Sequence, residues 1–301
     1  MTRNDWIMVT ACLGALAAGL LFPGQTAIFA PFPKACMMGV LFFNFLDIRP
    51  SEVVGSIRGK GPRTCGFLLF KMLLLPALAW GICRLVLPGY ALSALLLGGM
   101  SCGVAGPVFA AMYGVSAAFA TALVLFTSLL VPLTLPLLVK ALAGLSLNVS
   151  LWEMIRLLAE VVLIPFAAAE AARRFLPILI EPCRKYRFSA VVLLFVITNM
   201  GIFSGYGETV ATHPEILTGT VGAASLLALL FFFLPLFIYR KDPDTALNTA
   251  LGCGIMNNAI AVIFAAEQLG PTEALTAALY AIPYFLCLIP LRFAARTLTH
   301  S

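Results

Sequence analysis

Two stretches of the chain, 98-GGMSCGVAGP-107 and 252-GCGIMNN-258, interrupt apolar segments with glycine. They fall in the fourth and the ninth of ten apolar segments, so each is the fourth in a group of five. Lipid cannot satisfy the N–H and C=O groups of unwound backbone, which therefore persists at membrane depth only where it lines a protected cavity. Matching interruptions in two halves indicate a secondary transporter with its substrate site near the bilayer midplane. The plainer alternative is that these glycines only help helices to pack.

Composition places the chain in a membrane. Hydrophobic residues make up 61% of the 301 residues and charged residues 11%, whereas soluble domains carry about 25% charged residues. We therefore expect an all-α polytopic membrane protein, with residues 1–301 forming a single transporter domain whose halves cover about 1–145 and 146–301. Segments of about 20 apolar residues can span a bilayer. The ten predicted spans are 6–22, 31–46, 64–87, 91–112, 116–142, 151–171, 188–205, 215–238, 245–266 and 272–295.

The basic residues predict the orientation. Fourteen of the nineteen lie on one side of the predicted spans, which by the positive-inside rule puts both termini in the cytoplasm, with the protein in the plasma (inner) membrane. The run from Trp6 to Phe22 also resembles a signal peptide, but removing it would leave nine spans and disturb this pattern, so we interpret it as the first helix. The net charge of +6 reflects these loops and indicates no nucleic-acid partner. The fourteen residues are Arg3, Arg49, Arg58, Lys60, Arg63, Arg173, Arg174, Arg184, Lys185, Arg187, Arg240, Lys241, Arg292 and Arg296.

The sequence does not favour an enzyme. It contains no nucleophile–base arrangement, no metal-ligand spacing and no phosphate loop. Seven of the eight cysteines lie in apolar segments, and we expect free thiols. We predict no catalytic residue, no metal and no cofactor.

Lys71 is a charge at membrane depth. It follows Arg63 by eight residues, or about 12 Å of helix at 1.5 Å per residue, in a hydrocarbon core about 30 Å thick. A charge there costs at least roughly 2.5–3.5 kcal/mol, so Lys71 is a functional candidate. The alternative is a lipid-facing lysine that extends towards the headgroups.

Several motifs, in order, resemble the bile acid:sodium symporter family. The stretch 46-LDIRPSE-52 is similar to the family's turn after the second helix, and 71-KMLLLP-76 to its third-helix motif. Residues 99–114 and 252–258 correspond to its first and second crossovers. The resemblance extends over nearly the whole chain. It implies ten transmembrane helices in two inverted five-helix repeats, with crossed discontinuous helices 4 and 9, a core and a panel subdomain, and organic anions as substrates.

The departures from the family pattern concern sodium. Where the family's sodium ligands stand, this chain has residues that offer no side-chain oxygen, although sodium requires several oxygen ligands. We therefore expect transport that does not depend on sodium, with the ammonium of Lys71 supplying the missing charge. The departing positions are Lys71, Ala105, Gly106, Phe119, Leu123, Gly252 and Met256.

The resemblance also suggests where substrate binds. Asn257 matches an asparagine at the family's substrate site, and Tyr284 replaces a tenth-helix histidine and could offer a hydroxyl. Asn258 could cap the half-helix that begins beside it, and the positive ends of the broken helices suit a carboxylate. The predicted substrate site comprises Asn257, Asn258, Gly103, Ala105, Gly106 and Tyr284.

Glu160 is the only acid at a depth comparable with Lys71. It could pair with Lys71 or carry a proton, and a neutral carboxyl facing a neighbouring helix is an equal alternative. Proton coupling through Lys71 and facilitated diffusion both remain open.

The sequence leaves the solute and some function classes open. Small carboxylates and bulkier, bile-acid-like amphipathic anions both suit the family. A facilitator, a channel or a receptor could use the same fold, and so could an arsenite-permease-like carrier with Cys102 as a soft ligand, although no glutamate lies in 245–266. Besides substrate, protons and the lipid bilayer, no partner is indicated. The oligomeric state is open, and a monomer is compatible with the sequence.

Overall fold

The computed structural model describes residues 3–49, 53, 55, 61–144 and 150–299, and every regular element in these ranges is a helix. The longer elements are α1 (Arg3–Leu21), α3 (Pro33–Phe45), α5 (Gly61–Leu69), α6 (Leu75–Val86), α7 (Ala91–Gly99), α8 (Gly106–Met112), α9 (Ala117–Ala143), α10 (Leu151–Phe175), α11 (Pro177–Phe203), α13 (Glu215–Ile238), α14 (Pro243–Gly254), α15 (Asn258–Gln268), α16 (Pro271–Leu279) and α17 (Ala281–Thr299). The short elements are α2 (Pro23–Thr26), η1 (Ala27–Phe29), the π-helical η2 (Phe70–Leu74), η3 (Pro88–Tyr90), η4 (Ser204–Tyr206) and α12 (Gly207–Thr212).

Helices occupy all ten predicted apolar segments, and the two glycine-rich stretches separate helices as expected. The fourth segment is α7 followed by α8, and the ninth is α14 followed by α15. Five helices of the described chain are long and apolar enough to cross a membrane, or six if the bent pair Thr10–Leu21 and Pro23–Phe29 counts as one span. The halves of the broken segments are too short to count, since α7 has nine residues and α8 has seven. The protein is thus an all-helical, multi-pass membrane protein, and its ten-helix inverted-repeat architecture stays a prediction.

Local sequence explains where several helices begin. Proline is the first residue of α3, α11, α14 and α16, because the first turn of a helix does not need its missing N–H. Ser116 caps α9 by accepting a hydrogen bond from Phe119 N, and Asp242 caps α14 by accepting one from Thr245 N. Between α8 and α9, Gly114 has a φ of 76°, which favours glycine.

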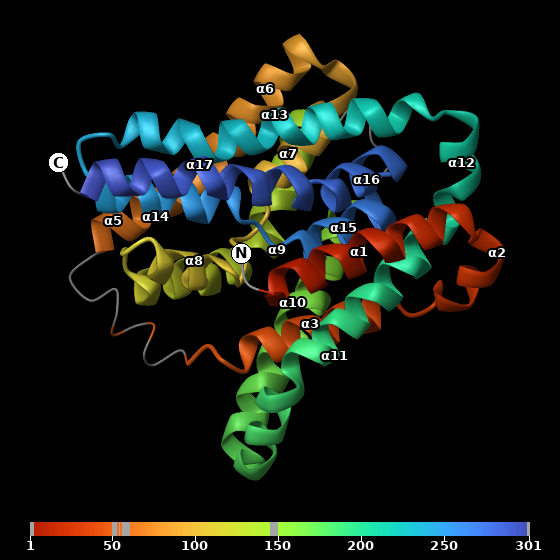
Figure 1. Ribbon diagram of the computed structural model, residues 1–301, viewed down its shortest axis with the longest axis horizontal. Helices are drawn as coiled ribbons and strands as arrows, with labels where there is room; N and C mark the ends of the chain where they lie inside the picture. The colour runs from red at the N-terminus through yellow and green to blue at the C-terminus, as the bar shows by residue number, and fades with distance from the viewer. Residues whose placement is uncertain (1–2, 50–52, 54, 56–60, 145–149, 300–301) are drawn as a thin grey trace.

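The helices form two groups (Figure 1). In the first group α11 packs against α1 and α3, and α3 packs against α10. The second group contains α5 to α9 and α13 to α17, with α6 against α7, α13 against α14 and α15 against α16. Contacts of α10 with α9 and α15, and of α3 with α15, join the groups. The ends of α10 and α11 that meet at 176 project from the rest of the molecule.

The surface carries many large apolar side chains. Leu85 is 87% exposed, and Phe237 is 71% exposed. Soluble monomers rarely expose extensive apolar surface. These side chains therefore fit contact with lipid.

Candidate functional site

The two glycine-rich stretches meet in the middle of the second helix group. Cys102 and Met256 form an antiparallel bridge. Gly103 N donates to Ile255 O at 2.7 Å, and Asn257 N donates to Ser101 O at 2.9 Å. We call this pairing of 100–105 with 255–257 the crossover. It satisfies backbone groups that lipid could not, so the two broken helices depend on each other.

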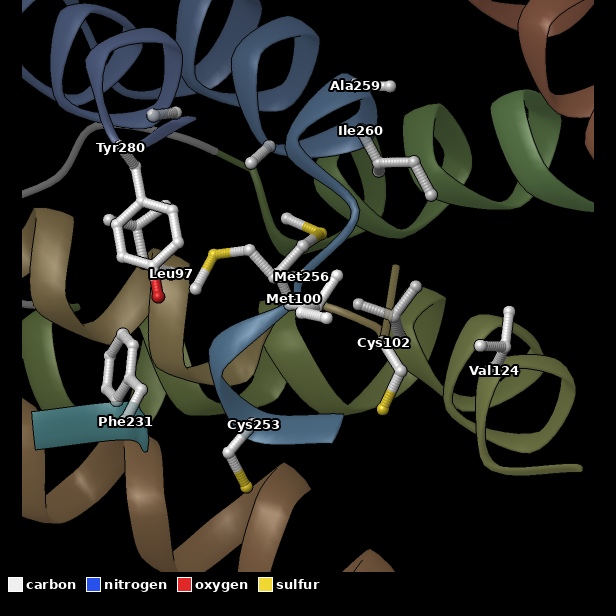
Figure 2. Close-up of a cluster of buried hydrophobic side chains, with 14 of the residues drawn as sticks. Leu97, Met100, Cys102, Val124, Phe231, Cys253, Met256, Ala259, Ile260 and Tyr280 are labelled. Carbon is white, nitrogen blue, oxygen red and sulfur yellow. The ribbon is translucent and has the colours of Figure 1, made fainter. Parts of the chain in front are cut away.

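Figure 2 shows the side chains around the crossover. Met100 and Met256 lie at its centre, with Tyr280 and Phe231 on one side and Cys102 on the other. Cys102 N donates to Thr127 Oγ1 of α9 at 2.9 Å, which ties the crossover to a continuous helix. The buried hydroxyls of Ser101 and Ser128 have no hydrogen-bond partner within the described residues.

Gly103 is required by the closeness of the two chains. A Cβ on Gly103 would lie 2.6 Å from Met256 O, a backbone atom that cannot move without breaking the bridge. Gly106, the first residue of α8, has no such neighbour within 4 Å of the place where a Cβ would lie. Among the predicted substrate residues of the stretch 98–107, Gly103 therefore has a structural role that Gly106 lacks.

At the stretch 252–258 the structure corrects one prediction about helix capping. Asn257, and not Asn258, is the N-cap of α15, and its Oδ1 accepts from Ile260 N at 3.5 Å. Asn258 is the first helical residue, and its Oδ1 is buried without a partner in the described chain. The shift by one residue arises because Asn257 has a non-helical backbone that pairs with Ser101, as an N-cap requires. Ala105 occupies the matching position before α8.

Lys71 is inside the protein, which excludes the lipid-facing alternative. Its exposed fraction is 0%, and Nζ donates to Gly98 O at 2.8 Å. Gly98 is in the last turn of α7, where backbone carbonyls carry the negative end of the helix dipole. Nζ also lies 6.0 Å from the centre of the Phe231 ring. The ammonium thus occupies the kind of position, a carbonyl end of a broken helix, where transporters of this general design bind cations.

The local backbone explains this placement. Lys71 lies in the π-helical turn η2, shortly before Pro76. Pro76 cannot donate to the carbonyl four residues earlier, and its ring crowds that carbonyl, so the helix widens there. Pro76 also packs against α7, because a Cβ on Gly98 would lie 2.8 Å from Pro76 Cα. The same contact brings Gly98 O to Lys71.

Tyr280 donates a hydrogen bond to the end of the other broken helix, α14, and it is not among the predicted site residues. Its Oη donates to Gly254 O, the last residue of α14, at 2.9 Å, and its side chain is fully buried. The predicted Tyr284 instead stacks on Tyr280 with ring centres 6.3 Å apart. A hydroxyl in the middle of an apolar segment, one turn before Tyr284, is the signal that could have identified Tyr280. Each of the two carbonyl ends therefore accepts a hydrogen bond from a buried side chain.

Glu160 is not a partner of Lys71, contrary to one of the predicted alternatives. Its Oε2 accepts from Lys34 Nζ at 2.6 Å, and its Oε1 accepts from Arg156 Nε at 2.7 Å. Glu160 points from α10 towards α3 in the first helix group, whereas Lys71 is in the second. With two cationic neighbours, Glu160 is also no neutral carboxyl facing a neighbouring helix.

Two cavities lie away from the six predicted substrate residues. One of about 230 Å³ is lined by α3, α11 and α15, with Lys34, Tyr206 and Glu267 as its polar residues. The other, of about 200 Å³, lies at the start of α5 beside Arg63. Neither is lined by a residue of the crossover.

Comparison with known proteins points to one family. The model of the sodium bile acid symporter family matches residues 36–213, more than half of the chain. The match includes the stretch 98–107 and Lys71, and it ends before the stretch 252–258. No curated protein matches the chain.

Proposed function

The chain belongs to the sodium bile acid symporter family and is therefore a secondary transporter, not an enzyme, and we propose that it carries small organic anions by alternating access without sodium. One observation carries the proposal: a buried lysine ammonium lies at the carbonyl end of a half-helix that crosses a second broken helix. In this proposal Lys71 supplies the positive charge that sodium supplies in relatives.

The crossover supports an anionic substrate. Two half-helices, α8 and α15, begin there, and the N-terminal end of a helix favours negative charge. The amide of Asn258, with its buried and unpaired Oδ1, and that of Asn257 are close to the start of α15. We propose that these groups, with Gly103, Ala105 and Gly106, surround a carboxylate, and that Tyr284 contributes from α17 through its contact with Tyr280.

The two glycine-rich stretches offer sodium no charged oxygen ligand. Neither 98–107 nor 245–266 contains an aspartate or glutamate, although sodium binding benefits from oxygen ligands that carry charge. Hydroxyls of Ser101 and Ser128 are present, but they are neutral. A second positive charge beside the Lys71 ammonium would be repelled, so a sodium ion is not expected there.

We further propose the architecture that this mechanism needs. Residues 1–301 would form one domain of ten transmembrane helices in two inverted repeats, with both termini in the cytoplasm. The group of α1, α3, α10 and α11 would be the panel, and the other group, which contains the crossover, would be the core. Rocking of one group against the other would open the crossover to each side in turn.

The experiment has two steps. A thermal-shift screen of organic anions, with sodium and with choline as the cation, identifies a ligand, because a ligand of the native state raises the apparent stability by RT ln(1 + [L]/Kd). Uptake of that ligand is then measured in proteoliposomes. Slow, saturable uptake supports a carrier, fast and weakly saturating flux supports a channel, and binding without flux supports a receptor. If Lys71 releases its proton during the cycle, an imposed proton gradient drives accumulation; if it does not, the protein is a facilitator.

A further inference from the structure

The cavity of about 200 Å³ is a recess between the start of α5, the start of α9 and the start of α14, near Tyr239 at the end of α13. Its lining is partly aromatic and partly polar. The residues that matter to its chemistry are Arg63, Phe67, Phe119, Tyr239, Thr245 and Thr249.

Arg63 supplies the charge of the recess. Its Nη2 donates to Asp244 Oδ2 at 2.7 Å, and its guanidinium lies over the Phe119 ring at 5.0 Å from the ring centre. Its Nε is buried and has no hydrogen-bond partner among the residues that the structure describes. Nε itself is out of reach of water, whereas the Arg63 side chain as a whole is 28% exposed and lines the recess, so a ligand would meet Arg63 through atoms other than Nε.

We propose that the recess is a second anion site, in which a small carboxylate binds the guanidinium of Arg63. A guanidinium stacked on an aromatic ring presents a planar edge that matches a carboxylate. Thr249 and Tyr239 line the same space and bring hydroxyls that suit a polar substituent of the acid, whereas the Thr245 hydroxyl donates to Asp242. Binding sites for drug-sized molecules have volumes of about 300–1,000 Å³. The smaller recess therefore selects compact acids and excludes sterol-sized anions.

The recess lies close to the crossover through Gly252 of α14, because a Cβ there would meet both the Phe67 ring and, at 3.5 Å, Cys102 Sγ. The ring of Phe67 would be 2.7 Å from a Cβ on Gly252, so it packs directly on the broken helix α14. Phe67 precedes Lys71 by one helical turn, and Thr249 precedes Cys253 by one turn. The recess would thus hold the anion on one side of the crossover, with Phe67 as the divider. This inference rests on the proposed transport of small organic anions.

Asp244 competes with the ligand in this arrangement. Its side chain is 48% exposed and occupies one edge of the guanidinium. A ligand carboxylate must bind the remaining edge against the repulsion of Asp244, so removal of that charge would strengthen binding.

The test uses pyruvate binding to the purified full chain, measured by isothermal titration calorimetry. Arg63→Lys keeps the charge and removes the planar edge, and it should raise the pyruvate Kd about tenfold. Asp244→Asn should lower the Kd several-fold. Arg84→Lys is the matched control, because Arg84 also lies over a ring, at 5.0 Å from the centre of Trp80, and its pyruvate Kd should not change. If Arg63 and Asp244 formed only a structural ion pair, Arg63→Lys and Asp244→Asn would not change the pyruvate Kd in opposite directions.

Two further variants separate the outcomes. Thr249→Val removes a hydroxyl of the recess with little change of shape and should weaken pyruvate binding even if Arg63→Lys fails to fold. Asn257→Ala tests the crossover alone: if it has no effect while the recess variants do, the proposed substrate site fails and the recess stands. An unchanged pyruvate Kd in Arg63→Lys, Asp244→Asn and Thr249→Val, or no pyruvate binding at all, would show that the recess holds only water and would overturn the proposal.

Discussion

The ends of the two broken helices depend on single side chains. Lys71 Nζ donates to Gly98 O and Tyr280 Oη donates to Gly254 O, and both side chains have an exposed fraction of 0%. A carbonyl left unpaired at such a place costs about 1–3 kcal/mol. These two donors therefore stabilise breaks that the backbone alone could not maintain in lipid.

Replacing Tyr280 with phenylalanine removes one of these donors and keeps the ring. Tyr280→Phe should lower the free energy of unfolding by about 1–3 kcal/mol, because Gly254 O loses its partner inside the protein. The measurement is the thermal unfolding midpoint in detergent. Tyr186→Phe, at a site 62% exposed, is the control and should change little. Equal midpoints for Tyr280→Phe and the unmodified chain would contradict a role for this hydroxyl.

Asn257 is predicted to contact the substrate as well as to cap α15. Asn257→Ala should weaken the affinity for the anion found in the stabilisation screen by about 1–3 kcal/mol, since a buried polar partner is lost. Asn199→Ala is a matched control, because Asn199 is also buried, at 7% against 6%, and within the described residues its side chain bonds only to Phe195 O. If the two variants bind equally well, Asn257 only caps the helix.

At the scale of elements, the sequence predicted where the two helices are interrupted, but not which contacts stabilise the interruptions. Glycines in 98–107 and 252–258 marked the unwound positions, and the predicted segment 215–238 matches α13. The predicted apolar span 188–205 covers only part of α11, which begins at Pro177, because the charged residues in between lower the hydropathy without ending the helix.

The pairing of distant side chains could not be predicted from the chain alone. Helical periodicity does not tell which neighbour a face meets, so Glu160 was considered for Lys71 although it binds Lys34 and Arg156. The choice between Asn257 and Asn258 as the cap depends on the bridge to Ser101, a contact between residues far apart in sequence. The widened turn at Lys71 likewise depends on Pro76 and its packing against Gly98.

Gly103 and Gly106 should differ in how well they tolerate replacement by alanine. Gly103→Ala should lower the unfolding free energy by at least about 1–3 kcal/mol, the usual range for overpacking, because its Cβ would meet Met256 O. Gly106→Ala, three residues along, has space for the methyl group and should fold normally. The yield of monodisperse protein and its unfolding midpoint distinguish the two. Equal behaviour of both variants would argue that the segments do not pair closely in the membrane.

At the scale of the molecule, the crossover and Lys71 belong to one helix group, while α1, α3, α10 and α11 form the other. A carrier needs such a division, because its substrate site must open to each side in turn. In the proposed mechanism the ammonium of Lys71 balances the charge of the anion without a bound cation. Movement of the substrate would then be linked to the state of that one residue.

Removal of that charge should stop transport. In Lys71→Met the side chain loses the ammonium and is only one atom shorter, and uptake of the anion in proteoliposomes should fall to background. Lys71→Gln should keep the polarity and still fail to supply the charge. Size-exclusion profiles and unfolding midpoints show whether the variants are folded, and rates equal to those of the unmodified chain in a folded Lys71→Met would remove Lys71 from the mechanism.

The most direct measurement is the dependence of uptake on sodium. Proteoliposomes take up the identified anion first in NaCl and then in choline chloride at the same ionic strength, with the unmodified chain. If Lys71 replaces the cation at the carbonyl end of α7, the two initial rates are the same, because no site requires sodium. A several-fold lower rate in choline chloride would mean that a working sodium site exists and would contradict the replacement of sodium by Lys71.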